Sequence, residues 1–151
     1  MHTTMLLPET TNFLVMLAAA VAAWLFGAMW YGSLGKLWIR AQGYTLDEFK
    51  AKQAEKIGKL SAQFPFILAF VAELIMAYVL YGLMKHVAHT NPLSVRTGLI
   101  SAAFVWLGFV ITILAVNNAF TGRSATLTVI DAGHWLGVML ILGAVLGALA
   151  T

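Results

Sequence analysis

The chain has 151 residues, of which 61% are hydrophobic and 10% are charged, and its formal net charge is +3. Soluble domains are about 45–50% apolar and about 25% charged, so we expect an integral membrane protein with one domain over residues 1–151. The absence of cysteine excludes disulfides, thiolate metal sites and cysteine nucleophiles. The basic residues gather in one linker without interleaved aromatic residues, so no nucleic-acid partner is expected.

The first apolar run covers residues 13–31. As a helix it reaches about 28 Å, enough to cross a hydrocarbon core of about 30 Å. Gly32 and Gly35 predict a break after this run. The first ten residues carry no Lys or Arg, so no secretory signal is expected. Small residues that allow close helix contact recur once per turn along the run, at Ala19, Ala23 and Gly27.

The linker at 32–63 contains a helix start. Thr45 and Glu48 form a capping box, in which the hydroxyl accepts the Glu48 backbone N–H and the carboxylate reaches back. We predict an amphipathic helix over about 45–60 that lies in the headgroup region, although a solvated linker helix fits the same pattern. Its apolar side carries Leu46, Phe49, Ile57 and Leu60. The lysines that flank this side are expected at the membrane surface: Lys50, Lys52, Lys56 and Lys59.

Three further apolar runs cover residues 64–84, 95–116 and 127–150. Pro65 falls in the first turn of the second run, where proline is tolerated. Four runs with short links predict an all-α fold, an integral membrane four-helix up-down bundle with the interfacial helix between spans one and two. Seven of the nine Lys and Arg residues lie on the side of the long linker. The positive-inside rule therefore predicts a cytoplasmic linker at 32–63 and both termini outside.

Four segments occur in an order that is typical of one family: Trp30-Tyr-Gly-Ser-Leu-Gly-Lys-Leu-Trp38 followed by Gly43, then Trp106-Leu-Gly-Phe109, Phe120-Thr-Gly-Arg123 and Ile130-Asp-Ala-Gly133. With these segments the chain resembles a bacterial membrane-protein family catalogued as domain of unknown function 1761. The resemblance covers roughly residues 13–147. It implies a four-span fold and a bacterial inner-membrane location, and it implies no known activity.

Glu73 is the clearest ionisable residue within an apolar run. It lies near the expected midplane of the bilayer, where a charged side chain costs at least about 2.5–3.5 kcal/mol. His134 lies at a depth within a few Å of it by helix rise, so a Glu73–His134 pair is allowed if the two spans touch. Replacing His134 with Gln should then alter the infrared titration of the Glu73 carboxyl.

Asp131 lies one turn before His134 on the same helix face. Arg123 in the preceding link, or Asn117 and Asn118 at the end of the third run, could satisfy its carboxylate. Arg123 is interpreted as a structural residue of the cytoplasmic rim, and Asp131 itself could have the same role. The candidate binding or transport residues are Glu73, His134, Asp131, Asn117 and Asn118.

No metal site and no cofactor are predicted. Glu73, Asp131 and His134 could together hold a metal ion, but zinc usually takes a ligand set richer in His or Cys. His86 and His89 could bind a metal on the outer face, although paired surface histidines are commonly just solvated. A single buried histidine disfavours a haem within one chain and leaves a haem shared between subunits open. The tryptophans are interpreted as belt and core residues rather than a cofactor cage.

Three functions fit these features. The first is a homo-oligomeric transporter or channel for an ion or small solute, lined by the buried polar residues. The alternative is an accessory or structural subunit that docks onto a larger membrane complex. A membrane enzyme acting on a lipophilic substrate, with His134 and a carboxylate as acid–base pair, is the third and least expected. The partners implied are the lipid bilayer and either further copies of the chain or other membrane subunits.

Overall fold

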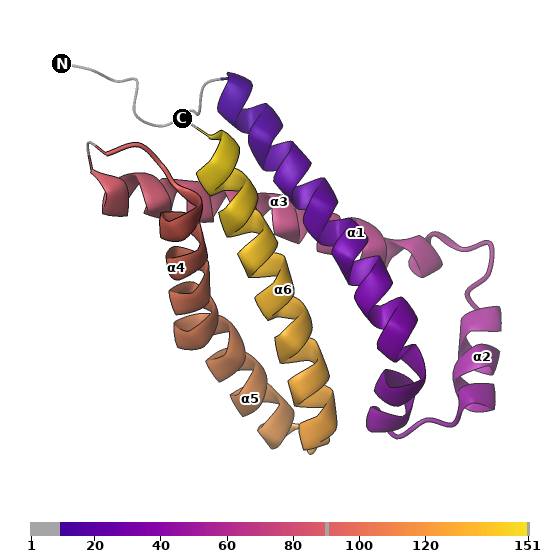
Figure 1. Ribbon diagram of the computed structural model, residues 1–151. Helices are drawn as coiled ribbons and strands as arrows, with labels where there is room; N and C mark the ends of the chain where they lie inside the picture. The colour runs from indigo at the N-terminus through magenta and orange to yellow at the C-terminus, as the bar shows by residue number, and fades with distance from the viewer. Residues whose placement is uncertain (1–9, 90, 151) are drawn as a thin grey trace.

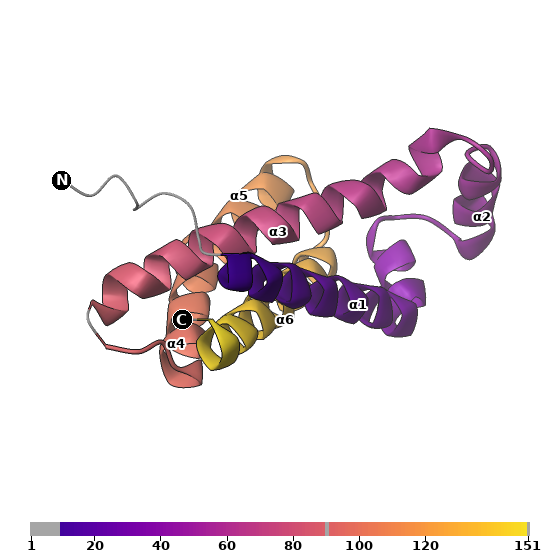
Figure 2. The same ribbon diagram turned by 90° about the horizontal axis from the view of Figure 1, so that it is seen from above.

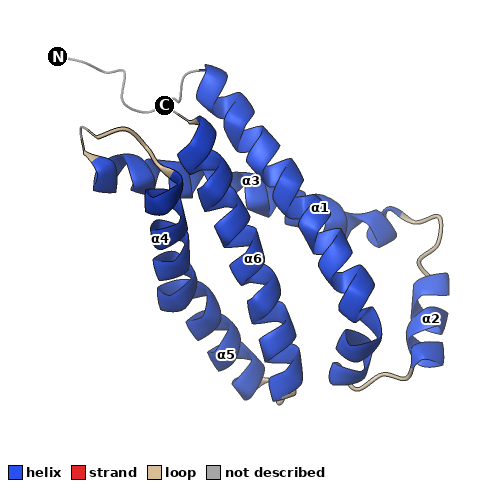
Figure 3. Cartoon of the chain, in the orientation of Figure 1, coloured by secondary structure: helices blue, strands red, loops and turns tan. Residues whose placement is uncertain are grey.

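The structure, a computed structural model, describes residues 10–89 and 91–150, and these form helices and connecting loops without a strand (Figure 3). Four helical segments are long and apolar enough to cross a membrane, which confirms the all-α, four-span prediction. The expectation of no secretory signal falls on residues outside the described ranges. The long segments are α1 (Thr10–Ala41), α3 (Leu60–Ala88), a third span of α4 (Val95–Val105), a π-helical segment (Trp106–Val110) and α5 (Ile111–Phe120), and α6 (Ala125–Leu149). The short α2 (Leu46–Ala54) lies between α1 and α3.

Helix α6 is the central element of the fold. Helix α1 packs along one side of it and the third span along the other, whereas α3 runs obliquely across all three (Figures 1 and 2). All four segments contribute to one core of apolar side chains with small residues at the closest contacts. This core includes Met16, Ala23, Ala77, Leu80, Met84, Ala102, Leu142 and Leu146.

Helix α1 is longer than the sequence indicates, and the predicted break at Gly32 and Gly35 is wrong. A glycine in a helix interior costs about 1 kcal/mol relative to alanine, which tertiary contacts can outweigh. Here the continuous helix places Tyr31 and Trp38 two turns apart on one face, where both reach α6. The helix ends instead in a Schellman motif, with Gly43 at φ +87° and the Tyr44 N–H donating to the Ile39 carbonyl at 3.3 Å.

The capping box that starts α2 is present, with the Thr45 N–H donating to Glu48 at 2.8 Å and the Glu48 N–H donating to the Thr45 hydroxyl at 3.3 Å. The predicted extent to residue 60 is wrong, because α2 ends at Ala54 and a turn follows that contains Gly58 at φ +79°. Ile57 and Leu60 therefore do not continue its apolar side.

Two further differences concern α3 and the third span. Helix α3 starts at Leu60, one turn earlier than expected, so Pro65 lies inside the helix rather than in its first turn. The third span is interrupted by the π-helical turn from Trp106 to Val110, whereas the apolar run at 95–116 predicts one continuous helix. Such turns frequently occur at functional sites.

Candidate functional site

The contact between α1 and α6 is built on glycines. No side chain separates Gly133 from the ring of Trp30, whose nearest atom is 3.0 Å from the place a Cβ would occupy, and Gly137 lies in the same way against Phe26. On the opposite helix, Gly27 leaves room for His134, whose Nε2 is 2.8 Å from the position of a Cβ. Because glycine has no Cβ, flat aromatic rings can lie directly on the facing backbone.

Asp131 is held by two donors from α1. The Tyr31 hydroxyl donates to Asp131 Oδ1 at 2.8 Å, and the Trp38 indole N–H donates to the same oxygen at 3.0 Å. These partners differ from the arginine and asparagines that the sequence suggested. A half-buried carboxylate can be stabilised by neutral donors, and hydrogen bonds to an ionised group are stronger than neutral ones. The donors lie about a hundred residues away in the chain, so sequence spacing carries no signal for them.

Two tryptophans bond to the backbone of α6 on either side of Asp131. Trp30 Nε1–H donates to the Ile130 carbonyl at 3.2 Å, and Trp106 Nε1–H, from the start of the π-helical turn, donates to the Ala132 carbonyl at 2.8 Å. Consecutive residues of α6 thus bond to α1 and to the third span. The tryptophans were interpreted as belt and core residues; the structure adds that they hold this turn of α6 in place.

His134 lies in an aromatic cluster and is 6% exposed. Its ring stacks on Phe26 at 6.2 Å between centroids and contacts the rings of Tyr31 at 4.8 Å and Trp135 at 5.0 Å. His134 Nδ1 is buried and has no hydrogen-bond partner among residues 10–89 and 91–150. A buried polar atom without a partner is uncommon and calls for an explanation.

Glu73 is 1% exposed and continues the buried face of α3 that carries Ala77 and Leu80. Its Oε2 atom likewise lacks a hydrogen-bond partner within the described part of the chain. Helices α3 and α6 do touch, as a Glu73–His134 pair requires. In this conformation, however, Glu73 Oε2 and His134 Nδ1 are not bonded to each other.

The remaining candidates lie elsewhere. Asn118 Nδ2 donates to the Thr128 hydroxyl at 3.0 Å and thereby joins α5 to α6, whereas Asn117 is exposed. Arg123 is exposed in the link between α5 and α6. His86, exposed on α3, donates its Nδ1–H to the Gly82 carbonyl at 2.9 Å. The structure therefore gathers Asp131, His134 and α1 aromatic residues, and not the asparagines, into one site.

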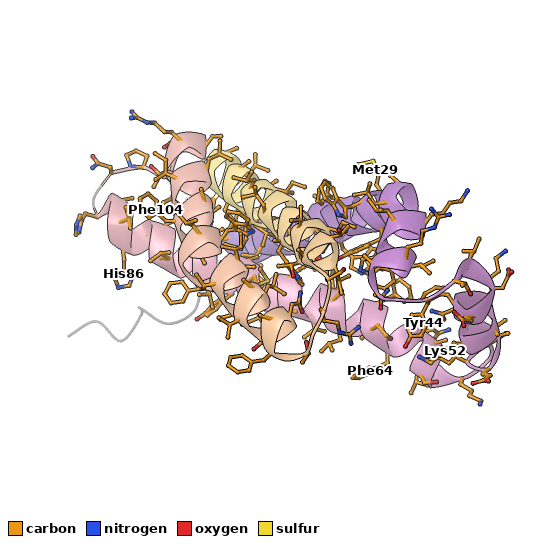
Figure 4. The ribbon with its side chains drawn as sticks, turned by 90° about the horizontal axis from the view of Figure 1, so that it is seen from below. Met29, Tyr44, Lys52, Phe64, His86 and Phe104 are labelled. Carbon is orange, nitrogen blue, oxygen red and sulfur yellow. The ribbon has the colours of Figure 1, made fainter. Side chains whose placement is uncertain are left out.

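The four linker lysines, Lys50, Lys52, Lys56 and Lys59, are all exposed. Lys52 Nζ lies 4.0 Å from the centre of the Tyr44 ring (Figure 4). The hydrogen bond and positive charge of Lys52 lower the pKa of the Tyr44 hydroxyl below its ordinary value. The expected position of these lysines at the membrane surface stays a prediction.

Taken together, the four long apolar helices and the buried polar residues define a multi-pass membrane protein. The chain belongs to the family described as "Protein of unknown function (DUF1761)", whose model matches residues 14–147. This confirms the family resemblance of the sequence segments. Neither the curated proteins nor the solved structures give a match to the chain.

Proposed function

We propose that the chain is a small transport protein that moves a proton or a small cation across a bacterial inner membrane. The observation that carries the proposal is Glu73, a carboxyl group 1% exposed, with one oxygen unpartnered among the described residues, inside a helix long and apolar enough to cross a membrane. A carboxyl group with a structural role is expected to be paired. One that exchanges a proton or a cation needs an oxygen that is free to take it up.

Asp131 and His134 provide the second stage of the proposed path. The Tyr31 hydroxyl bonds to Asp131, and its ring lies 4.8 Å from that of His134, so Tyr31 links the two ionisable groups. Chains of Asp, Glu and His are the usual proton relays of pumps and transporters. We hypothesise that Glu73 and His134 exchange a proton between helices that are already in contact.

The proposal also includes an orientation of the chain in the membrane. The link between α5 and α6 meets the end of α1, where the Ser124 hydroxyl donates to the Ala41 carbonyl at 2.7 Å. The loop between α1 and α2 and the link between α5 and α6 thus lie at one end of the molecule (Figure 1). The linker at 32–63 and the link between α5 and α6 carry most of the basic residues. The positive-inside rule favours a cytoplasmic position for this end. Asp131 would then lie nearer the cytoplasmic surface of the membrane, and Glu73 would lie farther from it.

Large faces of α3 and of the third span are not covered by other helices of the same chain. In their most apolar windows only 17% of α3 residues and 11% of third-span residues are buried within the chain. Such faces are available to further copies of the chain or to a larger membrane complex, so an accessory subunit is the second candidate function. Native mass spectrometry of the gently released protein separates the two. A discrete homo-oligomer supports transport, and a chain that co-purifies with other subunits supports the accessory function.

Proton flux into proteoliposomes, followed with an enclosed pH-sensitive dye, tests the transport proposal. We expect the unmodified chain to collapse an imposed pH gradient and Glu73→Gln to reduce the rate at least tenfold. Glu55→Gln is the matched control, since Glu55 is an exposed carboxyl in the turn after α2. No flux with the folded unmodified chain, for protons or for monovalent cations, or unchanged flux with Glu73→Gln, would refute the proposal.

The proposed exchange between Glu73 and His134 has its own test. Infrared titration of the Glu73 carboxyl should change in His134→Gln and remain unchanged in His86→Gln, whose histidine is exposed on the same helix as Glu73. An unchanged signal in His134→Gln would rule out the coupling. The transport proposal would then depend on Glu73 alone.

A further inference from the structure

A groove of about 300 Å³ lies between α5 and α6, where the two helices approach the link that joins them. Its size is at the lower end of the range for ligand pockets. It exists because α5 presents alanine on successive turns toward α6, so no side chain fills the space. The lining residues are Ala115, Ala119, Arg123, Ala125, Thr128 and Val129.

Arg123 is the only charged residue among those that line this groove. Its backbone is fixed by the helix end, because Gly122 adopts φ +65° and the Arg123 N–H donates to the Asn118 carbonyl at 2.8 Å in a Schellman motif. Ser124 then caps α6. Among the residues that the structure describes, no carboxylate pairs with the Arg123 side chain, which is exposed.

The apolar walls and the positive charge of the groove together fit a ligand that has both an apolar part and a negative charge. The alanine-lined walls lie on helices suited to the hydrocarbon core, where they fit an acyl chain. The arginine lies at the helix ends, where headgroups are found, and the next residue, Ser124, bonds to Ala41 in the last turn of α1, which also carries Arg40. Basic sites between transmembrane helices on the cytoplasmic side commonly bind anionic lipid headgroups.

We propose that this groove binds an anionic phospholipid, with one acyl chain against Ala115 and Ala119 and the phosphate on the Arg123 guanidinium. A zwitterionic phospholipid offers the same chain but no net negative charge. A free phosphate ion offers the charge but makes no use of the apolar walls. The site is separate from Glu73 and His134, so it does not depend on the transport function.

Native mass spectrometry of the full-length chain with equimolar phosphatidylglycerol and phosphatidylcholine tests the charge. We expect about a fivefold preference for phosphatidylglycerol, the size of one basic contact near the headgroups. Arg123→Gln should remove the preference and Arg123→Lys should largely retain it. The control is Arg96→Gln, an exposed arginine at the start of α4, which should leave the preference unchanged. A preference that survives Arg123→Gln would overturn the proposal.

A second pair of variants tests the acyl chain. Ala119→Leu fills the groove and should reduce retention of phosphatidylglycerol several-fold, whereas Ala28→Leu, on an exposed position of α1, should not. Both alanines are exposed, so neither change is expected to prevent folding. If Ala119→Leu has no effect while inorganic phosphate displaces phosphatidylglycerol, Arg123 is a simple anion site and the lipid proposal is wrong.

Discussion

Helix α6 and the third span are both long and apolar, but they pack very differently. In their most apolar windows 44% of α6 residues are buried and only 11% of those in the third span, although the third span is the more apolar of the two. Apolar content therefore does not identify the central helix of a membrane protein. In a bilayer, lipid covers an apolar side chain as well as another helix does, and close packing depends on small and polar residues instead.

The largest expected effect comes from breaking the contact that these two helices share. Gly143 on α6 lies against the backbone of Gly98 on α4, so any Cβ would clash with a carbonyl rather than with a movable side chain. We expect Gly143→Leu to lower the free energy of unfolding by about 3 kcal/mol, measured by titration with denaturing detergent. Gly82→Leu is the control, because apart from its own stretch of helix no atom lies within 4 Å of its Cβ position. Equal losses in both variants would contradict the packing argument.

A smaller decrease in the free energy of unfolding is expected when the polar contact between α6 and α1 is broken. Asp131→Ala leaves the Tyr31 hydroxyl and the Trp38 N–H without their acceptor, which should cost about 2 kcal/mol. Tyr31→Phe and Trp38→Phe should each cost less, and a double-mutant cycle with Asp131→Ala would give the coupling of each. Glu55→Ala, in an exposed turn, should be neutral. A neutral Asp131→Ala would show that the carboxylate does not hold α1 to α6.

The two faces of the third span are expected to differ in how much a substitution lowers the free energy of unfolding. Trp106→Phe removes the N–H that bonds to the Ala132 carbonyl of α6 and should cost about 1 kcal/mol. Phe104, two residues earlier, is 73% exposed. Phe104→Leu should leave detergent-solubilised monomers unchanged. Destabilisation of an oligomer by Phe104→Leu alone would identify the uncovered face as an interface between copies.

The smallest effect is expected outside the spans, at α2. The Thr45 N–H and hydroxyl both donate to the Glu48 carboxylate and lower its pKa. This contribution to α2 is therefore present above the ordinary carboxyl pKa of about 4.3. It is lost as pH falls through the lower value of the folded state. Amide exchange in α2, corrected for intrinsic rates, should quicken at low pH, and Thr45→Ala should quicken it about fivefold at neutral pH. Unaltered α2 exchange would refute this, and exchange in α6 serves as the internal control.

Much of the candidate site was accessible from sequence, but its partners were not. Glu73 and His134 stand out because ionisable groups within apolar runs are costly and therefore rare, and both are buried as expected. The donors to Asp131 were missed because they lie about a hundred residues away in the chain, and Trp38 also lies beyond the break expected at Gly32. Once α1 continues through that position, Tyr31 and Trp38 fall on one face. The π-helical turn at Trp106 was missed because a single turn is too short to change the hydrophobic periodicity of the run that contains it.

The amino-acid sequence by itself determined the class of protein, the four spans, the capping box at Thr45 and the positions of the costly charges. These follow from composition, run length and local hydrogen bonding, which require no knowledge of distant contacts. Only the tertiary structure decided that α6 is central, that α3 crosses obliquely, and that Asp131 bonds to Tyr31 and Trp38. The physical reason is helix rotation: the face that each span turns toward its neighbours depends on interlocking small and aromatic residues across helices, and no single span encodes it.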